Sequence, residues 1–439
     1  MAQVDWREDL EDWLAPFLAA MGHRKRRLWA PVYLQGLIGP GERKSLQPTA
    51  ARLGLRGHDQ LHHFVTSTTW HDAALRRVLV EKADGLVGGP DAVLVVDDTA
   101  LPKQGKRSVG VVRQYCGCLG KRANCQVLVS LTLANSEVPV PVGLRLFLPE
   151  AWVADADRCA EAGIPPEHRQ ALPKTDIALM EIDRLWAAGA RFGRVVADAG
   201  YGVSAAFRSG LSRRGLIWAV GIPKVQNVYA TTVELHWPKA STGRPRKHPV
   251  PSEAPVPAGQ ALVDALWRRI SWRRGTKKLL AAEFAAVRVR PAEGEQLRQG
   301  GHLPGEEVWL VGEHRSSGER KYHLSNLPEH ASLQELAAAI KARWICEQAH
   351  QQMKEELGLD HFEGRSWTGL HRHALMTMIA LCFLQHLRLQ ERGEKRSQTT
   401  RTTTTADPAS RATSAGRTVP PHMDPLPTLR HQPHQLPTC

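Results

Sequence analysis

Three features that would assign a chain to a class at once are missing from this sequence. No apolar run approaches the roughly 20 residues needed to cross a bilayer, and the longest covers only 374–384. Residues 1–14 are mixed and acidic, so no apolar signal segment is expected there. The seven cysteines are irregularly spaced, which indicates reduced thiols and not a disulfide framework. These absences predict a cytoplasmic protein that does not insert into membranes.

A shortage of acidic residues is the fourth absence. The 439 residues include 44 Asp and Glu against 58 Lys and Arg, which gives a formal net charge of +14. Such an excess attracts polyanions by electrostatic steering and by release of their counterions. Nucleic acid is therefore the expected partner, and association with the nucleoid is the expected location. A basic enzyme with an unrelated substrate is the alternative that charge alone leaves open.

Hydrophobic periodicity divides the chain into segments. Helical spacing over 1–88 predicts a helical N-terminal DNA-binding domain, with 49–65 as a candidate helix-turn-helix. Over 89–222 an antiparallel set of strands is followed by strands that alternate with helices, which predicts a mixed α/β domain. Residues 223–330 predict a β-rich insertion, and 331–391 return to helices that complete the core. The segment 392–439 is dominated by Thr, Pro, Arg and His, so we expect it to be disordered.

Two aspartates each follow a buried apolar run. Asp97 comes after Val-Leu-Val-Val at 93–96, and Asp198 comes after Val-Val-Ala at 195–197. A run of this kind that stops at a carboxylate predicts a strand that brings an acid to a sheet edge. Asp98 is a rival for the first position, but side chains alternate along a strand, so only one of the pair can face the site. Taken alone, each motif is also explained by a turn or a helix cap.

A third acid comes from the segment KARWICEQAHQQMKEE at 341–356. The pattern predicts one continuous helix that starts near Ser332. At helical spacing, one face would carry Arg343, Glu347, His350, Gln351 and Lys354. An acid flanked by two cations suits a metal ligand placed between phosphate contacts. The alternative is a solvated helix face with paired charges.

Together these motifs resemble the insertion-sequence transposases of the DDE superfamily. The resemblance rests on three motifs that occur in this order: VLVVDDTALPKQGK at 93–106, VVADAGYG at 195–202 and the 341–356 segment. One branch of the superfamily has a tyrosine–arginine–glutamate–lysine signature around the third acid. Arg343 and Lys354 stand at its arginine and lysine positions, whereas Ile340 occupies the tyrosine position. Segments 41–48, 109–117 and 357–373 are also similar, so the resemblance covers roughly 20–391 and leaves out the tail.

The resemblance implies an RNase H-like catalytic core in which Asp97, Asp198 and Glu347 are the catalytic metal ligands. Asp97 is preferred to Asp98 because the family pattern has an acid, any residue and a threonine, which Thr99 completes. The implied cofactor is a pair of Mg²⁺ ions, with Mn²⁺ as a substitute. The implied partners are double-stranded DNA, as terminal inverted repeats and as target, and a second copy of the chain in a homodimeric synaptic complex.

The expected activity is the cutting of insertion-sequence ends and their joining to target DNA by two-metal phosphodiester chemistry. The expected DNA contacts are Arg343, Lys354, Lys103, Arg268 and Arg273, the last two from the basic run LWRRISWRRGTKK at 266–278. Trp267 and Trp272 of that run should face opposite sides of a strand, which places one of them in the core. The alternative function is that of an inactive or truncated copy that binds DNA and regulates transposition.

Overall fold

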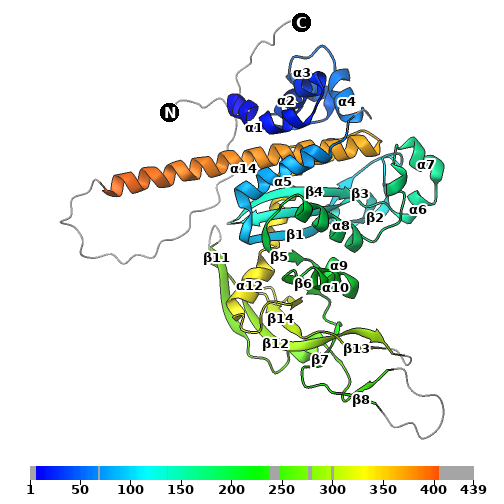
Figure 1. Cartoon of the computed structure of the whole chain (residues 1–439), viewed down its shortest axis with the longest axis vertical. Coiled ribbons are helices and arrows are strands. Elements are labelled where there is room, and N and C mark those ends of the chain that lie inside the picture. Colours follow the sequence, from blue (N-terminus) through cyan, green and yellow to red (C-terminus); the bar gives the residue numbers. More distant parts are fainter. Residues whose placement is uncertain are drawn as a thin grey trace.

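The molecule is elongated, with helices at one end, a sheet in the middle and a second group of strands at the other end (Figure 1). The computed structural model describes residues 6–67, 70–135, 137–237, 248–274, 279–297 and 301–404. At the helical end, three helices pack against the long helix α14 (Trp367–Thr404): α1 (Trp6–Ala20), α2 (Arg24–Ile38) and α4 (Asp59–Thr66). The short helix α3 (Leu46–Arg52) lies on the far side of this group and contacts α2 and α4 (Figure 1). Tyr33 on α2 donates a hydrogen bond to His373 on α14 over 2.8 Å, and Trp13 on α1 packs against Phe383 on α14.

The central sheet has the strand order and directions of an RNase H-like core. Three antiparallel strands are β1 (Gly89–Pro102), β3 (Lys121–Asn135) and β4 (Val138–Leu146). Two parallel strands follow on the other side of β1, namely β5 (Phe192–Ala197) and β6 (Trp218–Ile222). The short strand β2 (Val112–Cys116) pairs with the first half of β3. The predicted fold class, a mixed α/β sheet with flanking helices, is confirmed.

Helices cover both faces of this sheet because successive residues of its strands point to opposite sides and both sides are apolar. One buried cluster includes Leu94 and Val96, and a second includes Val95 and Val196. The flanking helical elements are α5 (Ala73–Val87), η1 (Gly117–Leu119), α6 (Glu150–Val153), α7 (Ala156–Glu161), η2 (Pro166–His168), α8 (Lys174–Ala187), α9 (Ala199–Gly202), α10 (Ala205–Arg213), α12 (Leu333–Lys341), α13 (Trp344–Glu355) and η3 (Leu359–His361).

Most strands of the insertion before α12 extend the central sheet, and two short ones pair with each other in a separate two-stranded sheet. Its β15 (Arg320–Ser325) pairs antiparallel with β6, so core and insertion share one 13-stranded sheet among the described residues. The other elements are β7 (Asn227–Ala230), β8 (Leu235–His236), β9 (Val250–Pro251), β10 (Val256–Pro257), α11 (Ala258–Ala261), β11 (Arg268–Arg274), β12 (Leu279–Gln296), β13 (His302–Pro304) and β14 (Val308–His314). The mostly β character predicted for this segment is therefore confirmed.

Two helix predictions need correction. The helix expected to run unbroken from near Ser332 is interrupted between α12 and α13, where the amides of Ile345 and Cys346 bond to the carbonyls three residues back. Helix α14 also continues to Thr404, past the expected start of disorder at Arg392. Glu, Lys, Arg and Gln, which are good helix formers, are frequent just after Arg392. The rest of the predicted tail, 405–439, lies outside the described residues.

Among the helices of the described ranges, none is both long enough and apolar enough to cross a bilayer.

Candidate active site

Strand register places Asp97 and Asp198 side by side. The parallel pairing of β1 with β5 ends at Val96 and Ala197, which are partners, so the next residue on each strand is an aspartate. Asp97 lies in the middle of β1, which runs on to Pro102, whereas Asp198 ends its strand and caps α9 by accepting the amide of Tyr201 at 3.2 Å. The sequence analysis predicted that Asp97 lies at the end of a strand. In the structure β1 continues past Asp97, and only its pairing with β5 ends there, so Asp97 and Asp198 are still neighbours.

Helix α13 brings the third acid to the same place. The break before α13 puts Arg343 at its N-terminus, from which the guanidinium donates to Asp97 Oδ2 at 2.5 Å and to Glu347 Oε1 at 2.7 Å. The thiol of Cys346 donates to the same Asp97 oxygen at 3.1 Å. Side-chain exposure differs along this chain of contacts, from 14% for Asp97 to 62% for Glu347. One cation therefore joins a half-buried carboxylate to a solvent-exposed one.

The environment of Asp97 disfavours its charge. Burial raises the pKa of Asp97, and the nearby negative charge of Asp198 acts in the same direction. The charge of Arg343 and the hydrogen bond from Cys346 oppose this rise without cancelling it. A buried carboxylate with a second one beside it forms a site that a cation stabilises.

Asp98 points to the opposite face of β1, as alternation predicts. Its carboxylate accepts hydrogen bonds from the hydroxyl of Tyr201 at 2.7 Å and from Lys174 Nζ at 2.5 Å. Burial, and then the charge of Asp98, raises the pKa of Tyr201 well above its ordinary value, so the phenol remains a donor. The two neighbouring aspartates thus have separate partners, and Asp98 is held by a tyrosine and a lysine away from Arg343.

The predicted cationic face of α13 is only partly formed. His350 is buried, and its Nε2 lies 2.8 Å from Ser130 Oγ on β3. Burial, with smaller contributions from Lys354 and Arg343, lowers the pKa of His350 to about 3. His350 therefore does not share the solvent exposure of Glu347, because the helix packs against β3 on that side. Lys354 is half-buried one turn beyond His350.

The three remaining cations predicted as DNA contacts lie in different settings. Lys103 donates to the carbonyl oxygens of Asp360 at 3.3 Å and Phe362 at 2.7 Å, so it ties β1 to the segment after α13. Arg273 forms an ion pair with Glu137 at 3.0 Å, and its guanidinium lies 3.9 Å from the ring centroid of Trp344. Arg268 on the same strand is exposed. Of the three, Arg268 has the setting expected of a phosphate contact.

The two tryptophans of the basic run pack against opposite faces of the insertion. Trp272 meets Phe284 edge to face at 5.9 Å between ring centroids, and Lys341 Nζ lies 4.4 Å from its ring. Trp267 packs against Gly312, where a Cβ would meet its ring at 2.6 Å. The expectation of opposite faces is confirmed, but both rings are partly buried in protein contacts. Residues 275–278 of this run lie outside the described residues.

Cys346 and Tyr201 were missed by the sequence analysis. Each acts on one member of the Asp97–Asp98 pair, and each comes from a segment far from that pair in sequence. Both residues stand inside the motifs that were singled out, next to Glu347 and three residues after Asp198. Their closeness to these acids in sequence was the only signal that could have identified them. Their residue types gave none, because a cysteine or tyrosine near an acid is usually a packing residue.

The donor set suits a hard divalent cation. Asp97, Asp198 and Glu347 would supply carboxylate oxygens, the ligands that Mg²⁺ prefers. Within the described ranges, no group of three or more His, Cys, Asp or Glu side chains is arranged to hold a metal ion. In this conformation Arg343 neutralises two of the three acids, and Asp198 is occupied as a helix cap.

Comparison with known proteins identifies the family of this chain. Residues 16–279, more than half of the chain, match the family described as DDE superfamily endonuclease, and the chain belongs to that family. The matched region contains Asp97 and Asp198 but stops before Glu347. Over 169 residues the chain is 30% identical to the probable transposase for insertion sequence element IS701 of Microchaete diplosiphon. The predicted relationship to insertion-sequence transposases of the DDE superfamily is confirmed.

The extent of these similarities is limited. The alignment with the IS701 protein spans 38% of this chain and 41% of that relative. A solved structure, the cryo-EM structure of the piggyBac transposase synaptic complex with hairpin DNA, is 10% identical with a TM-score of 0.37. That similarity covers 86% of this chain and 71% of the other.

Proposed function

We propose that the protein is a metal-dependent DNA transposase that cuts the ends of an insertion sequence and joins them to target DNA. Asp97, Asp198 and Glu347 are the proposed ligands of two Mg²⁺ ions, for which Mn²⁺ can substitute. When bound, such a pair activates the attacking oxygen and stabilises the leaving alkoxide at a phosphodiester. The proposed partners are double-stranded DNA and, in the synaptic complex, a second copy of the chain.

One observation carries this proposal. Asp97 and Asp198 are brought together by parallel strands, and Arg343 links Asp97 to Glu347 on α13. The three acids are 101 and 149 residues apart in sequence, so no local structural need, such as a turn or a cap, accounts for all three. Asp97 and Asp198 lie in the region that matches the endonuclease family, and Glu347 lies after it.

The neighbouring residues have distinct proposed roles. Arg343 neutralises Asp97 and Glu347 in the present conformation, and a bound cation would release its guanidinium toward a DNA phosphate. Cys346 orients Asp97 through the hydrogen bond to Oδ2. The Tyr201 and Lys174 contacts fix Asp98 on the other face, so that β1 presents only one of its two aspartates to the substrate.

The test is cleavage of supercoiled plasmid that carries the terminal repeats, with Mg²⁺ and with EDTA. We expect Asp97→Ala, Asp198→Ala and Glu347→Ala each to abolish cleavage, with DNA affinity nearly unchanged, because each removes a proposed metal ligand and not a phosphate contact. Asp98→Asn is the matched control, since it changes the adjacent acid while an oxygen acceptor for Tyr201 remains.

The outcome also separates the two candidate functions. Specific binding to terminal repeats without cleavage by the unmodified chain would favour a DNA-binding regulator. Retained cleavage in Asp97→Ala with loss in Asp98→Asn would show that the wrong aspartate was chosen. Cleavage that survives all four changes and EDTA would overturn the proposed mechanism.

A further inference from the structure

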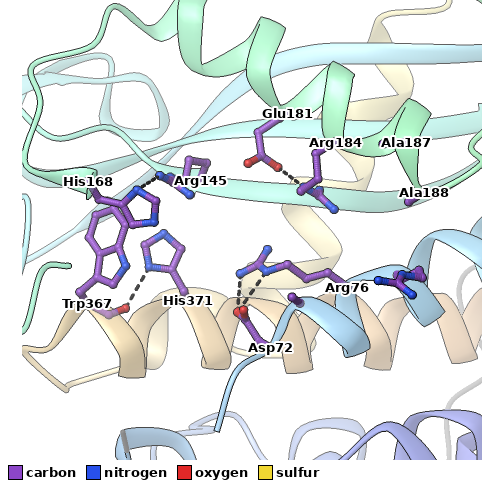
Figure 2. Close-up of a pocket in the computed structure, with 12 residues that line it drawn as sticks. Asp72, Arg76, Arg145, His168, Glu181, Arg184, Ala187, Ala188, Trp367 and His371 are labelled. Carbon is purple, nitrogen blue, oxygen red and sulfur yellow. Dashed lines mark hydrogen bonds and ion pairs between the residues drawn. The ribbon is translucent and has the colours of Figure 1, made fainter. Parts of the chain in front are cut away.

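A polar cavity lies away from the three acids. It has a volume of about 430 Å³ and is lined by residues on or next to α5, β4, η2, α8 and α14 (Figure 2). Its lining includes Arg76, Arg77, Arg145 and Arg184 but none of the three acids and none of the residues that contact them. Four arginines from three separate elements therefore converge on one space that the proposed chemistry does not use.

Two of the four arginines are neutralised. Arg76 donates to Asp72 at 2.8 and 3.0 Å, and Arg184 donates to Glu181 at 2.8 Å (Figure 2). Asp72 and Glu181 are the only carboxylates among the residues that line this cavity. The cavity lining therefore has an excess of two positive charges, which belong to Arg77 and Arg145.

Arg145 has a neutral partner. Its Nη2 donates to His168 Nδ1 at 2.8 Å, and burial together with the charge of Arg145 lowers the pKa of His168. Burial also lowers the pKa of the Arg145 guanidinium, as expected for a cation that is desolvated without sufficient opposite charge. His371 adds no charge, because its burial lowers its pKa to about 3. The buried end of the cavity is thus short of negative charge.

The one aromatic ring among the residues that line the cavity other than histidine, that of Trp367, is packed against other side chains. The Trp367 ring has His371 at 4.1 Å and His168 at 5.3 Å between centroids, and the Arg145 guanidinium lies 5.3 Å from it. A nucleobase would have to displace one of these contacts in order to stack on the ring. A ligand is therefore recognised by its charge, and guanidinium groups match the oxygens of phosphate in paired hydrogen bonds.

We propose that this cavity is a phosphate-binding site and that the phosphates belong to a DNA backbone that passes outside the cleavage site. The phosphate chemistry follows from the arginine lining alone. The DNA source rests on the proposed function and on the net charge of +14. A phosphorylated small molecule has the same chemistry, and the experiment distinguishes the two sources.

The first arm measures pyrophosphate binding to the full chain by calorimetry, without divalent metal. Arg77→Gln and Arg145→Gln should each weaken binding at least tenfold, because each removes a charged donor of hydrogen bonds to phosphate. Arg77 is exposed and none of its described contacts is an ion pair, so its variant should unfold at the same temperature as the original chain. Arg213→Gln on α10 is the matched control, an exposed arginine outside the cavity.

The second arm measures the salt dependence of binding to a short duplex that lacks transposon sequence. Each of the two cavity variants should reduce the slope of log K against log salt by about one unit, and pyrophosphate should compete. Absence of saturable pyrophosphate binding, or equal weakening by Arg213→Gln, would overturn the site. Pyrophosphate binding with an unchanged duplex slope would overturn the DNA source and assign a free phosphorylated ligand. Neither arm needs the three acids, so failure of the proposed catalysis leaves both results interpretable.

Discussion

At the scale of single residues, Cys346 offers a sharp test of how Asp97 is held. Cys346→Ala removes the thiol that donates to Asp97 Oδ2, and we expect the cleavage rate to fall about two- to tenfold, which corresponds to roughly 0.5–1.5 kcal/mol for one weak hydrogen bond. Cys346→Ser keeps a donor and should recover most of the rate. Single-turnover cleavage with Mg²⁺ is the measurement. Cys382→Ala is the control, because Cys382 is equally buried but lies on α14. An equal loss of rate in this variant would contradict the proposal that Cys346 orients Asp97.

Asp97 itself should limit stability at neutral pH. Its folded-state pKa is raised, chiefly by burial, so the ionised form costs folding free energy that the protonated form does not. Asp97→Asn cannot ionise and should therefore unfold at a higher temperature, by a few degrees, at pH 7.5. As pH falls through the raised pKa toward the ordinary value near 3.8, the difference should shrink. Thermal unfolding at several pH values tests this, and a variant that is less stable at pH 7.5 would mean that the Arg343 pair outweighs burial.

At the scale of elements, β11 connects the insertion to α13 through Arg273. Arg273→Ala removes an ion pair with Glu137 and a cation–π contact with Trp344, so we expect a loss of about 1–2 kcal/mol and faster proteolysis of the insertion. Arg268→Ala, on the same strand but exposed, should leave thermal stability unchanged and reduce the salt slope of DNA binding by about one unit. If the two variants behave alike, the distinction between an anchoring and a DNA-facing arginine fails.

At the scale of the whole molecule, α14 joins the N-terminal helices to the catalytic sheet. Among its residues up to Gly393, whose burial is described, the last buried side chain is that of Arg388. Chains truncated after Thr404 or after Glu391 should therefore unfold at the same temperature as the full chain and cleave equally well. Truncation after Ala380 is the positive control, since it removes Phe383, which packs 5.5 Å from Trp13. Differential scanning fluorimetry and cleavage assays give the readouts. A drop in unfolding temperature after removal of residues 392–439 would show that the C-terminal segment packs on the fold.

The sequence by itself determined the strands, their faces and the candidate acids. Val93 to Val96 is β-branched or apolar throughout, so β1 forms for local reasons, and alternation alone separates Asp97 from Asp98. The excess of basic residues likewise needs no structure to predict a polyanionic partner. These properties depend on neighbours in sequence or on sums over the chain.

Only the tertiary structure decided how distant residues meet. The break between α12 and α13 lets Arg343 reach Asp97, the sheet continues from β6 into β15, and Lys103 binds carbonyl oxygens of the η3 segment. The arginine-lined cavity combines α5, β4 and α8, none of which carries a motif for it. Such contacts join residues up to hundreds of positions apart, and their free energies arise from burial and charge that exist only once the sheet and α14 have packed together.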